Sequence, residues 1–161
     1  MSANVHPLKR AAIIVRDLHA SLDFYETLLG LNDWVQGEGT GIAAFAQLLG
    51  IDPASVIRYV ILKSGDTTVG MVGLFELSQP QPPEVVRPTT AATVGEVALV
   101  FHADDVGQIH RGMLARGLPV LCPPIRLEIP QLGVVSLEMT GRDPDGVLVN
   151  FIQQIKGPTG T

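Results

Sequence analysis

The hydrophobic pattern near the start of the chain predicts a strand followed by a helix. Residues 10–15 (RAAIIV) form a short apolar run rich in β-branched side chains, which is typical of a strand. In the next stretch apolar residues recur at helical spacing, and Asp17 stands where a helix N-cap is expected. Gly30 follows the last of these residues, in the position where glycine commonly ends a helix.

Three further features are predicted before the middle of the chain. The glycine-rich stretch 37–41 indicates a loop, and residues 42–52 (IAAFAQLLGID) predict a short helix. Residues 56–77 read as two strands joined by a turn over 64–66, where the sequence is Ser-Gly-Asp.

The second half of the chain repeats this order of elements. Residues 95–120 (GEVALVFHADDVGQIHRGMLARGLPV) read as a strand and a helix capped by Asp105, ending at Gly117, and residues 134–153 read as a hairpin. Each half is therefore expected to run strand, helix, strand, strand, strand. One such half cannot bury both faces of its sheet, so the two halves should pack together, within one chain or between chains.

The stretch 78–94 separates the two halves. It contains the prolines Pro80, Pro82, Pro83 and Pro88. Proline cannot donate a hydrogen bond to a sheet or continue a helix interior, so this stretch is expected to be a linker.

Composition and charge narrow the class of protein. Of 161 residues, 46% are hydrophobic and 17% charged, so the chain can form a packed core. The net charge of −5, with no cluster of Lys and Arg, argues against a nucleic-acid partner. The single cysteine excludes an intramolecular disulfide and the N-terminal residues lack an apolar leader, so we expect a soluble, cytoplasmic protein with no membrane partner.

Two stretches resemble characteristic sequences of a known superfamily. Residues 15–31 (VRDLHASLDFYETLLGL) and 142–153 (RDPDGVLVNFIQ) are similar to those of the vicinal oxygen chelate superfamily, which includes glyoxalase I, bleomycin-resistance proteins and extradiol dioxygenases. The resemblance covers about the whole chain. It implies an α+β fold in which two βαβββ modules, 9–77 and 95–155, form a curled mixed sheet around a ligand cavity, within one domain spanning 1–161.

Enzymes of this superfamily hold a divalent metal with His and Glu side chains from four strand positions, and the metal binds two oxygens of the substrate. Carried over to this sequence, the four positions fall on Arg10, Gly70, Ala98 and Asn150. None of these is a usual ligand, because two have no donor, one is a cation and the amide is a weak neutral donor. A shift of two residues would offer Glu96 or His102 in place of Ala98. The resemblance therefore implies that the ordinary metal site is absent, and we expect no cofactor.

Arg10 and Asn150 are the predicted ligand-binding pair. A buried, unpaired amide costs about 1–3 kcal/mol, so Asn150 should have a partner, and Arg10 is the expected one. The planar guanidinium suits carboxylate, phosphate or enolate oxygens, so Arg10 could replace the metal as the group that holds an anion. Alternatively, Arg10 pairs with Glu138 or Glu96 and closes the cavity.

Four other side chains are candidates for the site. Glu138 lies in an apolar strand, where a carboxyl group can act as a base, but exposure or a pair with Arg142 is equally possible. His102, at the end of a strand, could be a general acid or base, or merely a polar strand end. Met71 and Phe75 are expected to line an apolar cavity.

Two functions follow from these observations. The first is a small-molecule-binding protein, like the bleomycin-resistance branch, for a largely hydrophobic compound with an anionic or polar end. The alternative is an enzyme resembling lactoylglutathione lyase, an epimerase or a dioxygenase, using Arg10 with Glu138 or His102, or a displaced metal site. A homodimer is the expected state, because the superfamily commonly pairs modules across chains.

Overall fold

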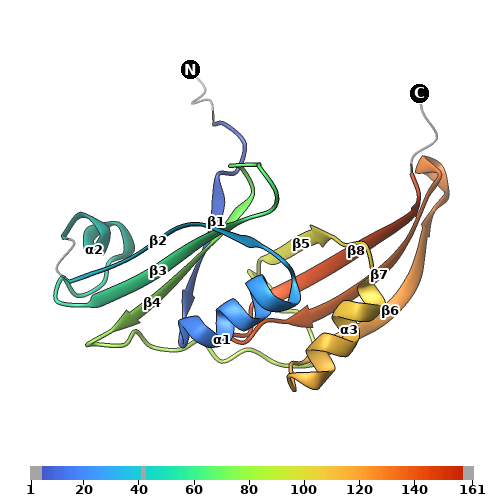
Figure 1. The fold of residues 1–161 in the computed structure, drawn as a ribbon. Helices are drawn as coiled ribbons and strands as arrows, with labels where there is room; N and C mark the ends of the chain where they lie inside the picture. The colour runs from blue at the N-terminus through green and yellow to red at the C-terminus, as the bar shows by residue number, and fades with distance from the viewer. Residues whose placement is uncertain (1–4, 41–42, 158–161) are drawn as a thin grey trace. The chain divides into compact units, whose positions relative to one another are not determined.

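The computed structural model describes residues 5–40 and 43–157. It divides into an N-terminal unit, Met1–Val85, and a C-terminal unit, Val86–Thr161. Residues 79–97 form neither helix nor strand, so the division falls within the proline-rich stretch. Each unit contains one four-stranded mixed sheet, which we name sheet A and sheet B, respectively. This α+β architecture of curled sheets agrees with the predicted fold class (Figure 1).

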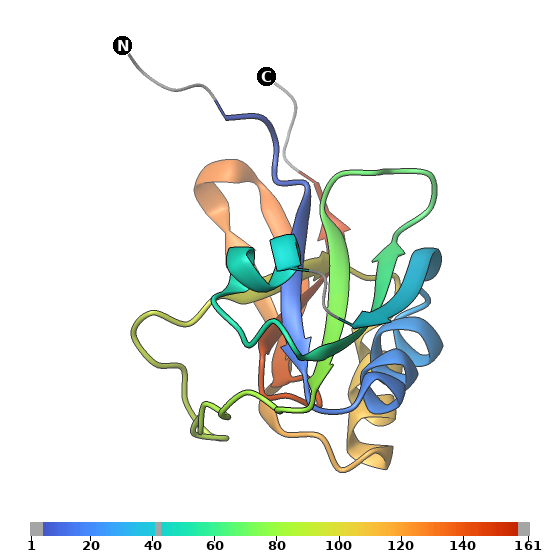
Figure 2. The same cartoon turned by 90° about the vertical axis from the view of Figure 1, so that its left-hand side faces the viewer.

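The N-terminal unit begins with a strand and a helix, as predicted. In chain order its elements are β1 (Arg10–Val15), α1 (Leu18–Leu22), the π-helical turn η1 (Asp23–Leu28), β2 (Asn32–Thr40), α2 (Ala43–Leu49), β3 (Val56–Lys63) and β4 (Met71–Ser78). The strand order of sheet A is β1-β4-β3-β2, with β1 parallel to β4 and the other pairs antiparallel. Figure 2 views this unit from the side of α2.

The C-terminal unit repeats this topology. Its elements are β5 (Ala98–His102), α3 (Val106–Ala115), β6 (Val120–Ile129), the 3-10 turn η2 (Pro130–Leu132), β7 (Val134–Arg142) and β8 (Leu148–Lys156). The strand order of sheet B is β5-β8-β7-β6, again with the first strand parallel to its neighbour.

The local signals that predicted both helices are confirmed. Asp17 accepts hydrogen bonds from the backbone nitrogens of His19 and Ala20, and Asp105 accepts one from that of Gln108. These bonds satisfy N–H groups that a helix start leaves without partners. Gly30 and Gly117 follow the two helices with φ of 73° and 66°, in the left-handed region that favours glycine.

Three predictions along the chain need correction. The expected loop at 37–41 is largely part of strand β2, which pairs with β3 up to Thr40. Gly37 serves packing, because a Cβ at this position would lie only 2.7 Å from the Tyr59 hydroxyl oxygen. Gly41 lies outside the described residues. The β3–β4 turn extends over 64–70 rather than 64–66. Strand β6 was not located from the sequence, since its two prolines obscure the pattern; they are tolerated because β6 is an edge strand.

The two faces of each sheet have different environments. One face carries the helix: the backbone nitrogen of Leu18 in α1 donates to Glu76 on β4, and that of Val106 in α3 donates to Gln153 on β8. This helix face contains much of the core, including the fully buried Phe24 and Leu74. We call the opposite side of each sheet its far face. None of the helices in the described ranges is both long and apolar enough to cross a membrane.

Candidate functional site

Arg10 lies at the start of β1 on the far face of sheet A. Its backbone is paired with Met71 on β4, and its side chain runs over the same strand. The Cδ atom lies 3.5 Å from the point that a Cβ on Gly73 would occupy, and the guanidinium carbon lies 6.0 Å from the centre of the Phe75 ring. The missing side chain at Gly73 therefore leaves room for both Arg10 and Phe75 against the strand.

Phe75 belongs to an aromatic cluster that continues across sheet A. Its ring centre lies 5.9 Å from that of Tyr59 on β3, with only 24° between the ring planes, and 5.2 Å from that of Phe45 in α2. Ile57 and Leu77 pack with this cluster and are buried. The far face of sheet A thus has a cation at one edge of a largely buried aromatic and aliphatic cluster, in which the rings of Tyr59 and Phe45 are only partly buried. A cation beside accessible rings suits an aromatic ligand with a negative group.

The charge of Arg10 is not neutralised within the part of the chain that the structure describes: neither an ion pair nor a hydrogen bond is made by its side chain there. Arg58, on β3 and on the helix face of the same sheet, differs because it bonds Glu76 at 3.1 Å. A guanidinium over an aromatic face keeps its N–H groups available for a planar anion.

Met71 and Phe75, predicted to line a cavity, lie on the same face as Arg10. Their side chains are 2% and 3% exposed. Both side chains therefore pack beneath and beside Arg10. Arg10 and Tyr59 are more exposed, so a ligand could reach these two residues first.

Asn150 lies on the far face of sheet B, and its amide partners come from the neighbouring strand. Its Nδ2 donates to the backbone oxygen of Met139 and to the Thr140 hydroxyl oxygen, both at 3.1 Å. Thr140 is its cross-strand neighbour in the register of β7 and β8. The prediction that the amide needs a partner is confirmed, because β7 accepts both hydrogen bonds of its Nδ2. The pairing with Arg10 stays a prediction.

Glu138 and His102 share one row of the far face of sheet B. Both are paired with Ile152, Glu138 from β7 and His102 from β5. Two strand spacings separate their backbones, about 10 Å. Glu138 accepts a hydrogen bond of 2.8 Å from the buried hydroxyl of Ser136, while His102 is exposed. At this separation the two side chains could contact opposite ends of one small molecule but not each other directly.

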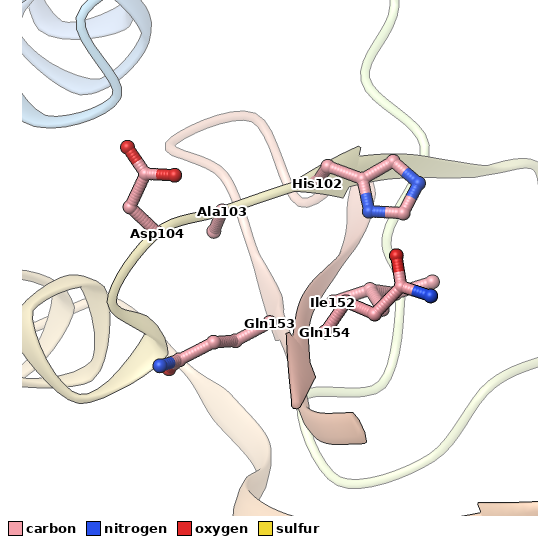
Figure 3. Close-up of a pocket in the computed structure, with 6 residues that line it drawn as sticks. All are labelled: His102, Ala103, Asp104, Ile152, Gln153 and Gln154. Atoms are coloured by element: carbon pink, nitrogen blue, oxygen red, sulfur yellow. The ribbon is translucent and has the colours of Figure 1, made fainter. Parts of the chain in front are cut away.

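A pocket of about 290 Å³ opens at the end of this row. It is lined by His102, Ala103, Asp104, Ile152, Gln153 and Gln154. Figure 3 shows the His102 ring and the Gln154 amide on one side, whereas Gln153 points toward α3. Gln153 is occupied there, because its side-chain oxygen accepts the hydrogen bond from the α3 backbone at 3.1 Å.

The partner of Arg142 differs from the one considered from the sequence, which was Glu138, and Glu96 has a second cation, Arg87, at 3.7 Å. Arg142 bonds both carboxylate oxygens of Glu96, at 2.6 and 3.2 Å, and not Glu138. Glu96 is thereby engaged and is not the partner suggested for Arg10. The hydrogen bond from Arg142, followed by one from the Thr93 backbone, lowers the pKa of Glu96 from 4.5 to about 2.

The donor set does not fit the divalent metal of the superfamily. On sheet A the far-face residues of β1 and β4 are Arg10, Ala12, Ile14, Met71, Gly73, Phe75 and Leu77, which offer no carboxylate, imidazole or thiolate. On sheet B the Asn150 amide is held by β7, and Glu96 is bound by Arg142. Within the described ranges no three His, Cys, Asp or Glu side chains gather closely enough to hold a metal ion.

Several residues of these surfaces were not found from the sequence. Tyr59, Phe45, Gly73 and Thr140 were missed. For Tyr59 a signal existed, because it lies two positions from both Ile57 and Ile61, and residues two apart in a strand share one face. For Gly73 the role depends on how the Phe75 ring leans across the strand, which no sequence pattern encodes.

The repeated topology of the two units defines a class of protein built from two βαβββ modules. The family model of the Glyoxalase/Bleomycin resistance protein/Dioxygenase superfamily matches residues 8–151. The chain therefore belongs to this superfamily, as its two characteristic stretches suggested.

Solved structures share the fold at low sequence identity. A glyoxalase family protein from Bacillus cereus matches with a TM-score of 0.76 and 16% identity, covering 96% of this chain and 97% of that one. TnmS3, an antibiotic binding protein from Streptomyces sp. CB03234, matches with a TM-score of 0.57 and 16% identity, covering 95% and 99%. A glyoxylase/bleomycin resistance protein/dioxygenase domain from Frankia sp. EAN1pec has a TM-score of 0.57 and 15% identity, covering 100% and 96%. No functionally curated protein matches the sequence significantly.

Proposed function

We propose that this protein binds a largely hydrophobic, aromatic small molecule with an anionic end, without the usual metal. The observation that carries this proposal is Arg10, a guanidinium that lies 6.0 Å from the Phe75 ring centre and has no anionic partner in the described parts of the chain. The anion would accept hydrogen bonds from the guanidinium fork, and the aromatic body of the ligand would contact Tyr59 and its neighbours.

Arg10 takes over one task of the metal in this proposal. A metal of the superfamily attracts substrate oxygens by its positive charge, and a fixed guanidinium can attract a carboxylate or enolate in the same way. The antibiotic-binding function of TnmS3 supports the proposal at the level of class, because that protein shares the fold. It says nothing about which compound this chain would bind.

Isothermal titration with a matched pair of probes tests the proposal. The aromatic anion 2-naphthoate should bind, and the uncharged 2-naphthylmethanol should bind at least about tenfold more weakly, since a hydrogen bond to a charged group contributes about 1.5–3 kcal/mol. Arg10→Met keeps much of the side-chain bulk but removes the charge, and should remove this preference. Arg10→Lys should retain only part of it, because the planar fork is lost.

Arg58→Met is the matched control. It makes the same change of charge on the same sheet, but Arg58 lies on the helix face and pairs with Glu76 at 3.1 Å. Equal losses in the two methionine variants would mean that general electrostatics and not a site at Arg10 binds the anion. Equal affinity of the wild-type protein for both probes would contradict the proposal outright.

An enzyme that uses Glu138 and His102 is the second candidate. The observation in its favour is their common row on sheet B, with Ile152 between them. A carboxylate as base and a histidine as acid could then act on opposite ends of one substrate, in a metal-independent isomerase or lyase. Once a compound that binds and turns over is known, Glu138→Gln and His102→Ala should abolish turnover and preserve binding; unchanged turnover in both would exclude this mechanism.

A homodimer belongs to the same proposal. Sheet B has its helix, α3, on one face, and its other face needs a partner, which a second copy can supply. Light scattering during size-exclusion chromatography should give twice the chain mass of 17.2 kDa. A single chain mass at all concentrations would contradict it.

A further inference from the structure

Two oxygen atoms on the far face of sheet B, Oδ1 of Asn150 and Oε2 of Glu138, accept no hydrogen bond from the residues that the structure describes. The Nδ2 atom of Asn150 is held by Met139 and Thr140, which fixes the orientation of the amide. Its other atom, Oδ1, accepts no hydrogen bond from any residue that the structure describes. The arrangement therefore turns the amide into an oriented acceptor, because both bonds are made by its donor side.

Glu138 supplies the second acceptor and a negative charge. One carboxylate oxygen, Oε1, accepts from Ser136 at 2.8 Å. Throughout the described ranges no Lys, Arg or His forms an ion pair with this carboxylate, and Arg142, the nearest candidate by sequence, is committed to Glu96 at 2.6 Å. Glu138 thus retains a free oxygen and an unbalanced charge.

The register brings these acceptors to one place. Glu138 is paired with Ile152 and Thr140 with Asn150, so Glu138 and Asn150 are diagonal neighbours on β7 and β8. Diagonal neighbours on one face lie about 7–8 Å apart at the backbone, a distance at which two acceptor side chains can both reach a nitrogen between them. A group carrying several N–H donors fits this geometry better than a single hydroxyl.

Apolar side chains surround the acceptor pair. Ile125 is paired with Glu138 from β6, Val100 with Asn150 from β5, and Ile152 lies in the Glu138 row. Ile125 and Val100 are 50% and 59% exposed. The acceptor pair is therefore flanked on either side by an exposed apolar side chain that the hydrocarbon body of a ligand can cover.

We propose that the far face of sheet B binds the ammonium group of an apolar amine, with the Glu138 carboxylate and the Asn150 amide oxygen as acceptors. The ammonium donates one N–H to each, and its hydrocarbon body lies to one side of the pair, against Val100 on β5 or Ile125 on β6. A metal ion is disfavoured at this place, because one carboxylate and one amide oxygen are too few ligands. This site is separate in sequence and in charge from the anion site at Arg10.

The test uses 2-phenylethylamine and its uncharged analogue 2-phenylethanol. Titration of ¹⁵N-labelled protein at neutral pH should give amine-induced shifts at Glu138, at Asn150 and at the flanking Val100 or Ile125, and at least tenfold weaker effects with the alcohol. Glu138→Gln keeps the shape and removes the charge, and should weaken amine binding at least tenfold. Glu128→Gln, an exposed carboxylate on β6 that pairs with Arg126 at 2.7 Å, should leave it unchanged.

The outcomes separate this inference from the proposed function. Amine binding that survives Glu138→Gln, shifts confined to other surfaces, or equal binding of the alcohol would each overturn the amine site. If 2-naphthoate binding is still lost in Arg10→Met, the anion site stands without it. Conversely, amine binding that depends on Glu138 and is unaffected by Arg10→Met supports this inference even where the anion site fails.

Discussion

The guanidinium of Arg142 binds the carboxylate of Glu96 across 46 residues of sequence, with the Arg142 side chain only 1% exposed. The same guanidinium donates to the backbone oxygens of Gly146, in the β7–β8 turn, and Ala91, in the segment before β5. The Arg142 side chain therefore connects the segment before β5, at Ala91 and Glu96, to the turn between β7 and β8.

Arg142→Met should destabilise the C-terminal unit. The substitution removes the guanidinium that donates to the Glu96 carboxylate and to two backbone oxygens. Removal of one partner from a buried ion pair is strongly destabilising. We expect the thermal midpoint to fall on the order of 5 °C or more, measured by circular dichroism. Arg126→Met, which breaks an exposed pair with Glu128, is the control and should change it little; similar losses in both would contradict a special role of Arg142.

The Glu96–Arg142 pair also predicts a pH dependence. The folded pKa of Glu96, about 2, lies below its ordinary value of 4.5, so the ionised form is favoured by folding. Its contribution to stability is fully present above pH 4.5, declines as the pH falls and is lost near pH 2. In urea titrations between pH 6 and pH 2, Glu96→Gln should reduce the loss of unfolding free energy in this window. If the unfolding free energies of the variant and the wild type fell in parallel with pH, Glu96 would not be the group responsible.

Gly73→Ala should weaken the site on sheet A through Phe75. An added Cβ would lie 2.8 Å from the Phe75 Cε2 atom, so the ring that supports Arg10 must move. Overpacking of this kind costs typically about 1–3 kcal/mol. In a Phe75→Leu background the same alanine should cost less, since the colliding ring atoms are absent, and a double-mutant cycle by urea denaturation measures the difference. Additive effects would show that the two residues do not interact.

Asn150→Asp tests the fixed orientation of the amide. A carboxylate would place an acceptor against the Met139 backbone oxygen, where the amide now donates at 3.1 Å. We expect a loss of about 1–3 kcal/mol in unfolding free energy at neutral pH. The loss should shrink in mildly acidic buffer, where a protonated carboxyl can donate again. A variant as stable as the wild type at neutral pH would mean that the amide is not held in this way.

The fold could be predicted largely because its signals are local. Asp17 and Asp105 as caps, the glycines that end the helices, and the β-branched run 10–15 each act within a few residues, and the repeat then fixed the topology. The failures arose where packing overrides local preference. Gly37 reads as a loop residue, yet it pairs with Tyr59 in β2, where the Tyr59 ring occupies the space that a side chain would need.

The site was predicted less completely, because its partnerships depend on register. Alternation placed Asn150 on the correct face, but not its bond to Thr140, which requires knowing how β7 and β8 align. Likewise, the sequence suggested Glu138 as a partner of Arg142 and Glu96 as a partner of Arg10, and only the course of the chain before β5 brings Glu96 to Arg142. Single side chains could be predicted as candidates; pairs of them could not.

The last prediction concerns the metal. Protein purified without a histidine tag, exposed to Mn, Fe, Ni, Co or Zn and dialysed, should retain less than about a tenth of an equivalent by elemental analysis, because tight sites require three or more suitable ligands. Asn150→Glu restores the carboxylate found in the superfamily, yet should not restore binding, since the far-face residues of β1 and β4 still contribute no ligand. A full equivalent in the wild-type protein would contradict this reading. It would direct attention to His102 and Glu138, which would then have to be joined by further ligands.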